Sequence, residues 1–256
     1  MKQLIAKGAA AVVLGAATLA FSAGAGLAAD ATALLRAAFD NWRANSSEST
    51  VTMTIHRPGW ERHLTMKGWT QGHDKALVRF TAPAKDAGNA TLKLGKTTLI
   101  FNPKLNQVIK LPASMLAQSW MGSDFSYNDL SKAEDILTEY THKIVGSGHA
   151  GGHTVYTVEA LPKPGAPVVW GKQQAKVRDD GVLLQETFFD QDMKVVRQMT
   201  TDKVGRIGGR DYPVVVTMRP ANKKGQWTQL VTTQARFNIP IPAYVFTRSN
   251  LQNPRD

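Results

Sequence analysis

Residues 120–130 read W-M-G-S-D-F-S-Y-N-D-L, and the rest of the chain can be understood from this stretch. Its large side chains are Trp120, Met121, Phe125 and Tyr127. They are spaced too irregularly for a strand. Gly122 permits a sharp turn, and Ser126 and Asp129 have the S-x-x-D spacing of a capping box, which predicts a helical turn. We interpret the segment, with the short helical pattern at 113–119, as a lid over an apolar surface. A core-packing loop is the alternative.

On both sides of this segment the sequence has the period of two that is typical of strands. Val51, Met53 and Ile55, for example, alternate with polar residues, and short turns such as Asp179-Asp180-Gly181 separate the runs. The pattern indicates an antiparallel meander of about eleven strands. The runs are 51–55, 64–68, 76–80, 88–94, 97–101, 107–111, 138–145, 154–161, 170–178, 182–189, 194–204, 212–220 and 226–237.

A helix is predicted at 31–45, because Leu34, Leu35, Ala38, Phe39 and Trp42 recur at helical spacing after a possible N-cap at Asp30 or Thr32. No low-complexity linker follows, so 29–256 is predicted to be a single domain. A large sheet with so few helices must curl, close or be covered. We therefore expect a mainly β fold in which this helix and the segment 113–131 cover a curled sheet and enclose an apolar space.

The first 28 residues have the pattern of a secretory signal peptide. Lys2 and Lys7 precede an apolar run at 9–20, and small residues follow up to the predicted cleavage site near Ala28 or Ala29. We therefore expect export, which in a bacterium means the periplasm. The chain contains no cysteine, so neither a disulfide nor a lipid-modified cysteine is expected. No later stretch is apolar enough to predict a membrane span.

Removal of the signal peptide leaves 256 − 28 = 228 residues and lowers the net charge from +11 to +9, because two lysines and no acids are lost. A basic protein can attract nucleic acid or an anionic membrane. Export argues against nucleic acid as a partner. Anionic headgroups attract a nearby Lys or Arg by about 1 kcal/mol each. A generally solvated basic surface is the alternative interpretation.

The sequence does not predict an enzyme. His56 and His63 lie on the polar face of their predicted strands, and His149 and His153 bracket a turn without an evident third metal ligand. No G-x-S-x-G motif, phosphate-binding loop or dinucleotide fingerprint is present. We therefore predict no catalytic residues, no metal and no cofactor.

The segment at 120–130 resembles the LolA-like family of periplasmic outer-membrane lipoprotein-sorting proteins, in the branch that carries a W-M-G-S-D-F-S-Y-x-D-L segment. A second match is G-K-T-T-L-I-F-N-P at 95–103, and a weaker one is V-F-T at 245–247. The resemblance covers essentially all of the chain after residue 28. It implies an unclosed, strongly curved β-barrel with a helical lid over a hydrophobic cavity, which carries lipid-modified proteins or lipids through the periplasm.

We also predict partners: an inner-membrane transporter as donor and an outer-membrane acceptor. Burying a sixteen-carbon chain is worth roughly 13 kcal/mol against water, but a bilayer already supplies that energy, so the partners must set the direction of transfer. The alternative function is a non-catalytic lipid-binding sensor or adaptor of the cell envelope. The residues predicted to line the cavity and lid are Met53, Met66, Phe80, Phe101, Met115, Leu116, Trp120, Met121 and Phe125.

One feature of the sorting carriers is missing. They have a functional arginine in the turn before the third strand, which latches the lid. The corresponding turn here, 71–74, contains no arginine, and the nearby Lys75 and Arg79 do not match the position. The latch is therefore expected to be absent or to use other residues, and lipid-like cargo is favoured over lipoprotein.

Overall fold

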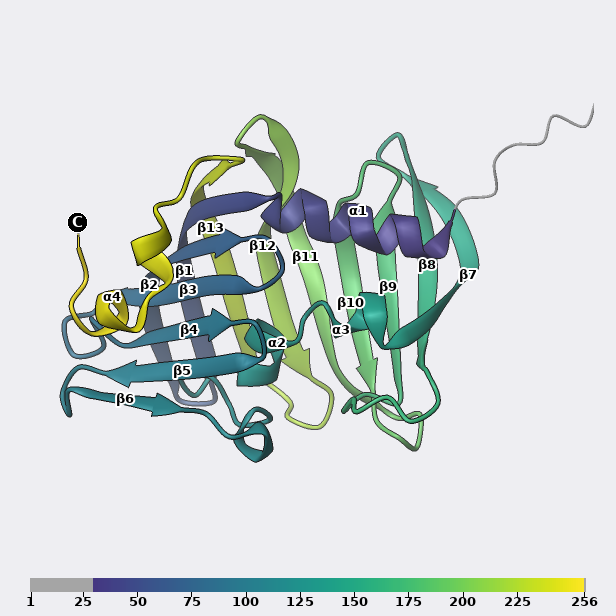
Figure 1. The fold of residues 1–256 in the computed structure, drawn as a ribbon. Coiled ribbons are helices and arrows are strands. Elements are labelled where there is room, and N and C mark those ends of the chain that lie inside the picture. The colour runs from purple at the N-terminus through teal and green to yellow at the C-terminus, as the bar shows by residue number, and fades with distance from the viewer. Residues whose placement is uncertain (1–29, 256) are drawn as a thin grey trace, which may run out of the picture.

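The computed structural model describes residues 30–255, and the predicted signal peptide lies outside these residues. The described chain forms one antiparallel sheet of thirteen strands with a few short helices (Figure 1). The elements are α1 (Ala31–Arg43), β1 (Ser46–Arg57), β2 (Trp60–Gln71), β3 (Lys75–Ala82), β4 (Ala90–Leu94), β5 (Thr97–Asn102), β6 (Gln107–Lys110), η1 (Ala113–Met115), α2 (Tyr127–Ser131), α3 (Asp135–Thr138), β7 (Tyr140–Ala150), β8 (His153–Pro162), β9 (Lys172–Arg178), β10 (Leu183–Phe189), β11 (Val195–Ile207), β12 (Arg210–Pro220), β13 (Trp227–Phe237), η2 (Ala243–Phe246) and α4 (Arg248–Gln252).

The strand order is β6-β5-β4-β3-β2-β1-β13-β12-β11-β10-β9-β8-β7, so the sheet does not close on itself. Its two halves join where β1 pairs with β13. At that junction Met53 lies opposite Leu64 on β2 and Leu230 on β13. Directly opposed residues of antiparallel strands share a face, and an apolar row therefore crosses the middle of the sheet. The mainly β, unclosed fold predicted from the sequence is confirmed.

One face of the sheet carries α1. Asp30 is its N-cap, and the Asp30 Oδ1 accepts a hydrogen bond of 2.9 Å from the Thr32 backbone N–H. Leu35 and Ala38 of the helix are buried in a cluster with strand residues that include Val158 and Ala175. In Figure 1 the helix runs across the strands of the second half of the chain. The predicted helix is confirmed, and it ends at Arg43.

The C-terminal segment covers the opposite face, over β3, β4 and β5. Phe246 and Leu251 pack in a cluster with Leu77, Leu92 and Phe101. Arg79 of β3 also anchors this segment, since its Nη2 donates a hydrogen bond of 2.7 Å to the Asn250 carbonyl. Each face of this half-barrel is thus covered by a different part of the chain.

The structure has thirteen strands, one for each run named from the sequence, so the estimate of about eleven was too low. Three hairpins are longer than predicted: β1–β2, β7–β8 and β11–β12. β7 extends to Ala150 and β11 to Ile207, because the turns use only Gly151-Gly152 and Gly208-Gly209. All four glycines have positive φ, which other residues adopt at a cost. Within residues 30–255, no helix has the length and apolar character needed to cross a bilayer.

Candidate functional site

Residues 113–131, here called the lid, form a compact unit that includes η1 and α2. Its two ends are joined by backbone hydrogen bonds from Tyr127 N–H to the Gln118 carbonyl (3.2 Å) and from Asn128 N–H to the Leu116 carbonyl (2.7 Å). The predicted capping box is present: Ser126 and Asp129 each accept from the other's backbone N–H. These bonds hold the lid together as one body.

The lid lies on the apolar face formed by β1, β2 and β3. Trp120 packs on Phe80 with ring centroids 5.2 Å apart, and its Nε1 donates to Thr91 Oγ1 at 3.3 Å. Phe125 lies in the same cluster. Met53, in the sheet below, is 0% exposed. The lid is therefore closed, and a ligand can reach this methionine only if the lid moves.

The structure brings six of the nine predicted lining residues into this one cluster: Met53, Met66, Phe80, Trp120, Met121 and Phe125. Met115 and Leu116 lie in the first turn of the lid, and the Met115 side chain is exposed. Phe101 lies elsewhere. It pairs with Ala90, whereas Ile100 pairs with Thr91, the residue that contacts Trp120. Phe101 is thus on the outer face, beneath the C-terminal segment. Ligand contact by the nine residues stays a prediction.

Arg197 of β11 holds the C-terminal part of the lid. Its guanidinium forms a two-point ion pair with Asp129, with a distance of 2.8 Å from Nη1 to Oδ2. The same Nη1 donates to the Asp124 carbonyl at 3.1 Å. The guanidinium also lies over the rings of Phe188 and Trp170, at 4.5 and 4.8 Å. Two-point geometry and burial make this contact stronger than an exposed ion pair.

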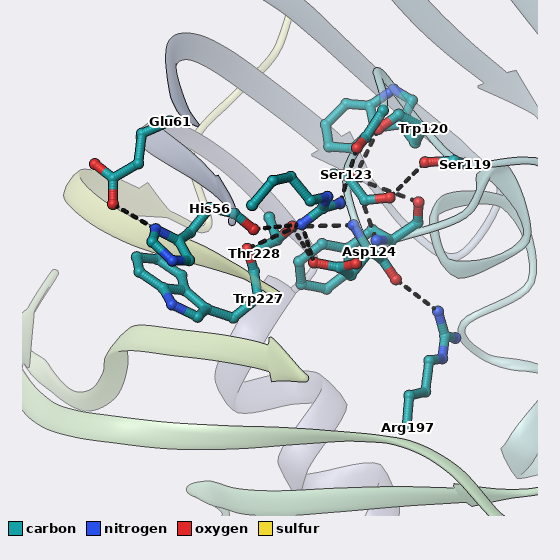
Figure 2. A network of polar contacts seen from close by, with 12 residues as sticks. His56, Glu61, Ser119, Trp120, Ser123, Asp124, Arg197, Trp227 and Thr228 are labelled. Carbon is teal, nitrogen blue, oxygen red and sulfur yellow. Dashed lines mark hydrogen bonds and ion pairs between the residues drawn. The ribbon is translucent and has the colours of Figure 1, made fainter. Parts of the chain in front are cut away.

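Two arginines of the β1–β2 hairpin hold the tip of the lid. Arg57 contacts Asp124 Oδ2 through Nη1 and the Gly122 carbonyl through Nη2, both at 3.0 Å. Arg62 donates to the Met121 carbonyl at 3.1 Å. Asp124 also accepts from Thr228 Oγ1 at 2.7 Å (Figure 2). The lid is therefore latched, and the latch uses Arg57, Arg62 and Arg197 in place of an arginine in the turn at 71–74.

A family model with the description "Uncharacterized protein" matches residues 72–253, which include the whole lid and the strands on both sides of it. The chain belongs to this family. Among curated proteins, none matches this chain.

Three solved structures have a fold similar to that of this chain. A DUF1329 family protein from Desulfovibrio piger has a TM-score of 0.77 at 21% identity and covers 86% of this chain and 97% of its own. An outer membrane lipoprotein-sorting protein domain from Vibrio parahaemolyticus has a TM-score of 0.74 at 19% identity, and the match covers 87% of this chain and 98% of that domain. A LolA superfamily protein from Nitrosomonas europaea has a TM-score of 0.72 at 20% identity, and the match covers 87% of this chain and 99% of that protein. The predicted LolA-like fold is confirmed.

Glu186 of β10 is an acid on the lid-bearing face of this LolA-like fold. It lies between Ala175 on β9 and Met199 on β11, in the row that continues to Met218. Burial raises the pKa of Glu186 from its ordinary 4.5 to about 7, with a smaller rise from the Asp129 carboxylate that Arg197 opposes. Near neutral pH this side chain is therefore partly protonated.

Replacing Glu186 with Gln is expected to remove a pH-dependent loss of stability. Between pH 4.5 and 7 the unfolded chain releases this proton while the folded chain keeps it, so the free energy of unfolding falls as pH rises. Glu186 keeps partial exposure, which reduces the effect. Between pH 5 and pH 8 we therefore expect the free energy of unfolding of the native protein to fall by about 2 kcal/mol more than that of Glu186→Gln. Urea unfolding of both proteins at pH 5 and pH 8 measures it. Parallel changes in the two proteins would contradict the assignment.

His153, Asp180 and Asp211 have ligand atoms within 4.8 Å of one another, which is compatible in spacing with a metal site. The guanidinium of Arg178 already contacts all three. It lies 2.7 Å from His153 Nε2, and 3.0 Å from both Asp180 Oδ1 and Asp211 Oδ2. Because the permanently charged Arg178 occupies the centre, we interpret this group as an ion-pair cluster that links β9 to β12.

Proposed function

We propose that the protein is a non-catalytic periplasmic carrier. It binds the acyl chains of lipids or lipoproteins on the lid-bearing face and shuttles them from an inner-membrane transporter to an outer-membrane acceptor. The supporting observation is an apolar cluster around Met53 and Phe125 whose cover is held by ion pairs at its rim. Such a cover can be released without breaking the sheet. The Vibrio relative described as a lipoprotein-sorting domain supports the same class of cargo.

The side chains under the lid suit flexible ligands. Met53, Met66, Met199 and Met218 belong to or pack against the cluster. Methionine adapts its shape easily, so these residues can close over one another without cargo and rearrange around an acyl chain. Displacing the lid has a cost, and transfer from a bilayer is close to neutral in hydrophobic energy. The donor and acceptor proteins therefore supply the direction.

The test is mass spectrometry of a chloroform–methanol extract of protein purified gently from the periplasm. The proposal expects a lipid or an acylated peptide in roughly stoichiometric amount. A protein that yields no lipid, and that takes up none when incubated with inner-membrane vesicles and their transporters, would contradict it.

The second candidate is a lipid-binding sensor or adaptor, and the closed lid over a fully covered Met53 favours it. In that function the acyl chain reports on the envelope and is not delivered. A transfer assay separates the two: a carrier passes labelled lipid to outer-membrane acceptor vesicles, whereas a sensor keeps it.

A further inference from the structure

A hollow of about 480 Å³ lies between the lid and the turn that joins β12 to β13. The lid contributes residues on both sides of Asp124, β1 contributes Arg57, β11 contributes Arg197, and the turn contributes Lys223. Figure 2 shows the guanidinium of Arg197 directed toward Asp124. The hollow thus adjoins the latch from outside, and the methionines under the lid do not line it.

The charges around this hollow are unbalanced. Its lining has three cations, Arg57, Arg197 and Lys223, and one carboxylate, Asp124. With Asp129, which pairs with Arg197 from outside the lining, the formal excess is 3 − 2 = +1. Lys223 is exposed and forms no ion pair within residues 30–255. The Nε of Arg197 is buried and has no hydrogen-bond partner in that range. Lys223 is therefore a spare cation at the rim of the hollow, next to two arginines held only by the latch contacts, which favours an anionic ligand.

The arrangement of the donors favours phosphate. They come from two strands and a turn, so they approach from different directions, which matches the oxygens of a tetrahedral group better than a planar carboxylate. Two of them are guanidinium groups, which bind phosphate oxygens in pairs, and the third is an ammonium group that acts as a point charge. The amides of Asn222 and Gln226 add uncharged donors at the same rim.

We propose that this hollow binds the phosphate of a lipid headgroup and that the bound phosphate loosens the lid. The phosphate competes with Asp124 for Arg57 and with Asp129 for Arg197, which are the ion pairs that hold the lid. The headgroup thereby weakens the latch at the moment when its acyl chains need access to the apolar face. The proposal rests on the proposed function, because it assigns a headgroup site to the same cargo.

A single thiol reports the opening of the lid, since the chain has no cysteine of its own. Met53→Cys places it under the lid, where the native side chain is 0% exposed. The rate of its reaction with a maleimide is measured alone, with glycerol 3-phosphate, with inorganic phosphate and with phosphatidylglycerol vesicles. Retention of 1-palmitoylglycerol, which has an acyl chain and no phosphate, is measured separately.

We expect glycerol 3-phosphate and phosphatidylglycerol to speed the labelling about tenfold, the scale of one or two charge-assisted hydrogen bonds. In the same background Lys223→Glu should lose most of this acceleration. Lys224→Glu is the matched control, because Lys224 is the next residue and is exposed but does not line the hollow. It should keep the acceleration, so general charge effects are separated from the site.

Unchanged labelling with every phosphate probe, or equal losses in Lys223→Glu and Lys224→Glu, would overturn the headgroup site. If 1-palmitoylglycerol is still retained in that case, the carrier proposal survives alone. Loss of its retention would instead contradict the carrier proposal. Acceleration by inorganic phosphate that equals that of phosphatidylglycerol would overturn the lipid headgroup as the source and point to free phosphate.

Discussion

Arg197→Ala is expected to release the lid and to lower the free energy of unfolding by about 3 kcal/mol. The Arg197 and Asp129 side chains are only 8% and 17% exposed, so removing the arginine leaves a largely buried carboxylate without its cation. The Asp124 carbonyl loses a donor as well. Because each 1.4 kcal/mol is tenfold, labelling of Met53→Cys should accelerate about 100-fold if the whole loss falls on lid closure.

Urea unfolding and maleimide labelling measure the two effects. The matched control is Arg236→Ala, which removes another arginine from an ion pair, with Glu48, but at a surface position where the arginine side chain is 69% exposed. Exposed pairs contribute about 0–1 kcal/mol, so this variant should resemble the parent in both assays. If Arg197→Ala behaves like Arg236→Ala, the ion pair does not hold the lid.

A disulfide between lid and sheet should stop the uptake of acyl chains until it is reduced. Thr98 of β5 and Ser131 of α2 have their hydroxyl oxygens 2.8 Å apart, so Thr98→Cys with Ser131→Cys brings two sulfurs close to the bond length of about 2.0 Å. Backbone hydrogen bonds join the two ends of the lid, so a disulfide that holds α2 restrains the whole lid. We expect uptake of a fluorescent fatty acid to fall at least about tenfold when oxidised, since each 1.4 kcal/mol of extra opening cost is tenfold.

The control disulfide joins two strands and leaves the lid free. Ser47 and Thr70 are directly opposed on β1 and β2, with hydroxyl oxygens 2.7 Å apart. Ser47→Cys with Thr70→Cys should therefore take up the fatty acid equally well before and after reduction. Uptake by the oxidised lid disulfide at the rate of this control would mean that cargo enters without movement of the lid.

Local signals in the sequence were sufficient for α1 and for the start of α2, but not for the C-terminal cover. Asp30 and the apolar spacing after it predict α1, and Ser126 with Asp129 predicts the start of α2. Both depend on residues within one or two helical turns of each other, so no long-range contact is needed to recognise them. The strand runs were recognisable for the same reason, although the ends of several strands were misplaced, such as β1, which spans Ser46–Arg57 and was predicted at 51–55.

The latch could not be predicted from local patterns, because Arg57 and Arg197 lie 67 and 68 residues from the lid acids they contact. One signal was available. Arg57 continues the alternation of Met53 and Ile55, and Arg62 precedes Leu64 and Met66 with the same parity, so both arginines belong to the apolar face. Phe101 shows the converse. Its apolar character is plain, but only the pairing of β5 with β4 decides that it faces the C-terminal segment.

The most direct test of the account is to find where an acyl chain lies. Purified protein is loaded with a fatty acid that carries a diazirine along its chain, irradiated, digested and analysed by mass spectrometry. The account predicts cross-links to the peptides that contain Met53, Met66 and Phe125, and their loss when the oxidised lid disulfide is present before loading. Cross-links that concentrate instead at Phe101 and Phe246 on the outer face, or a protein that acquires none, would contradict an acyl-binding face beneath the lid.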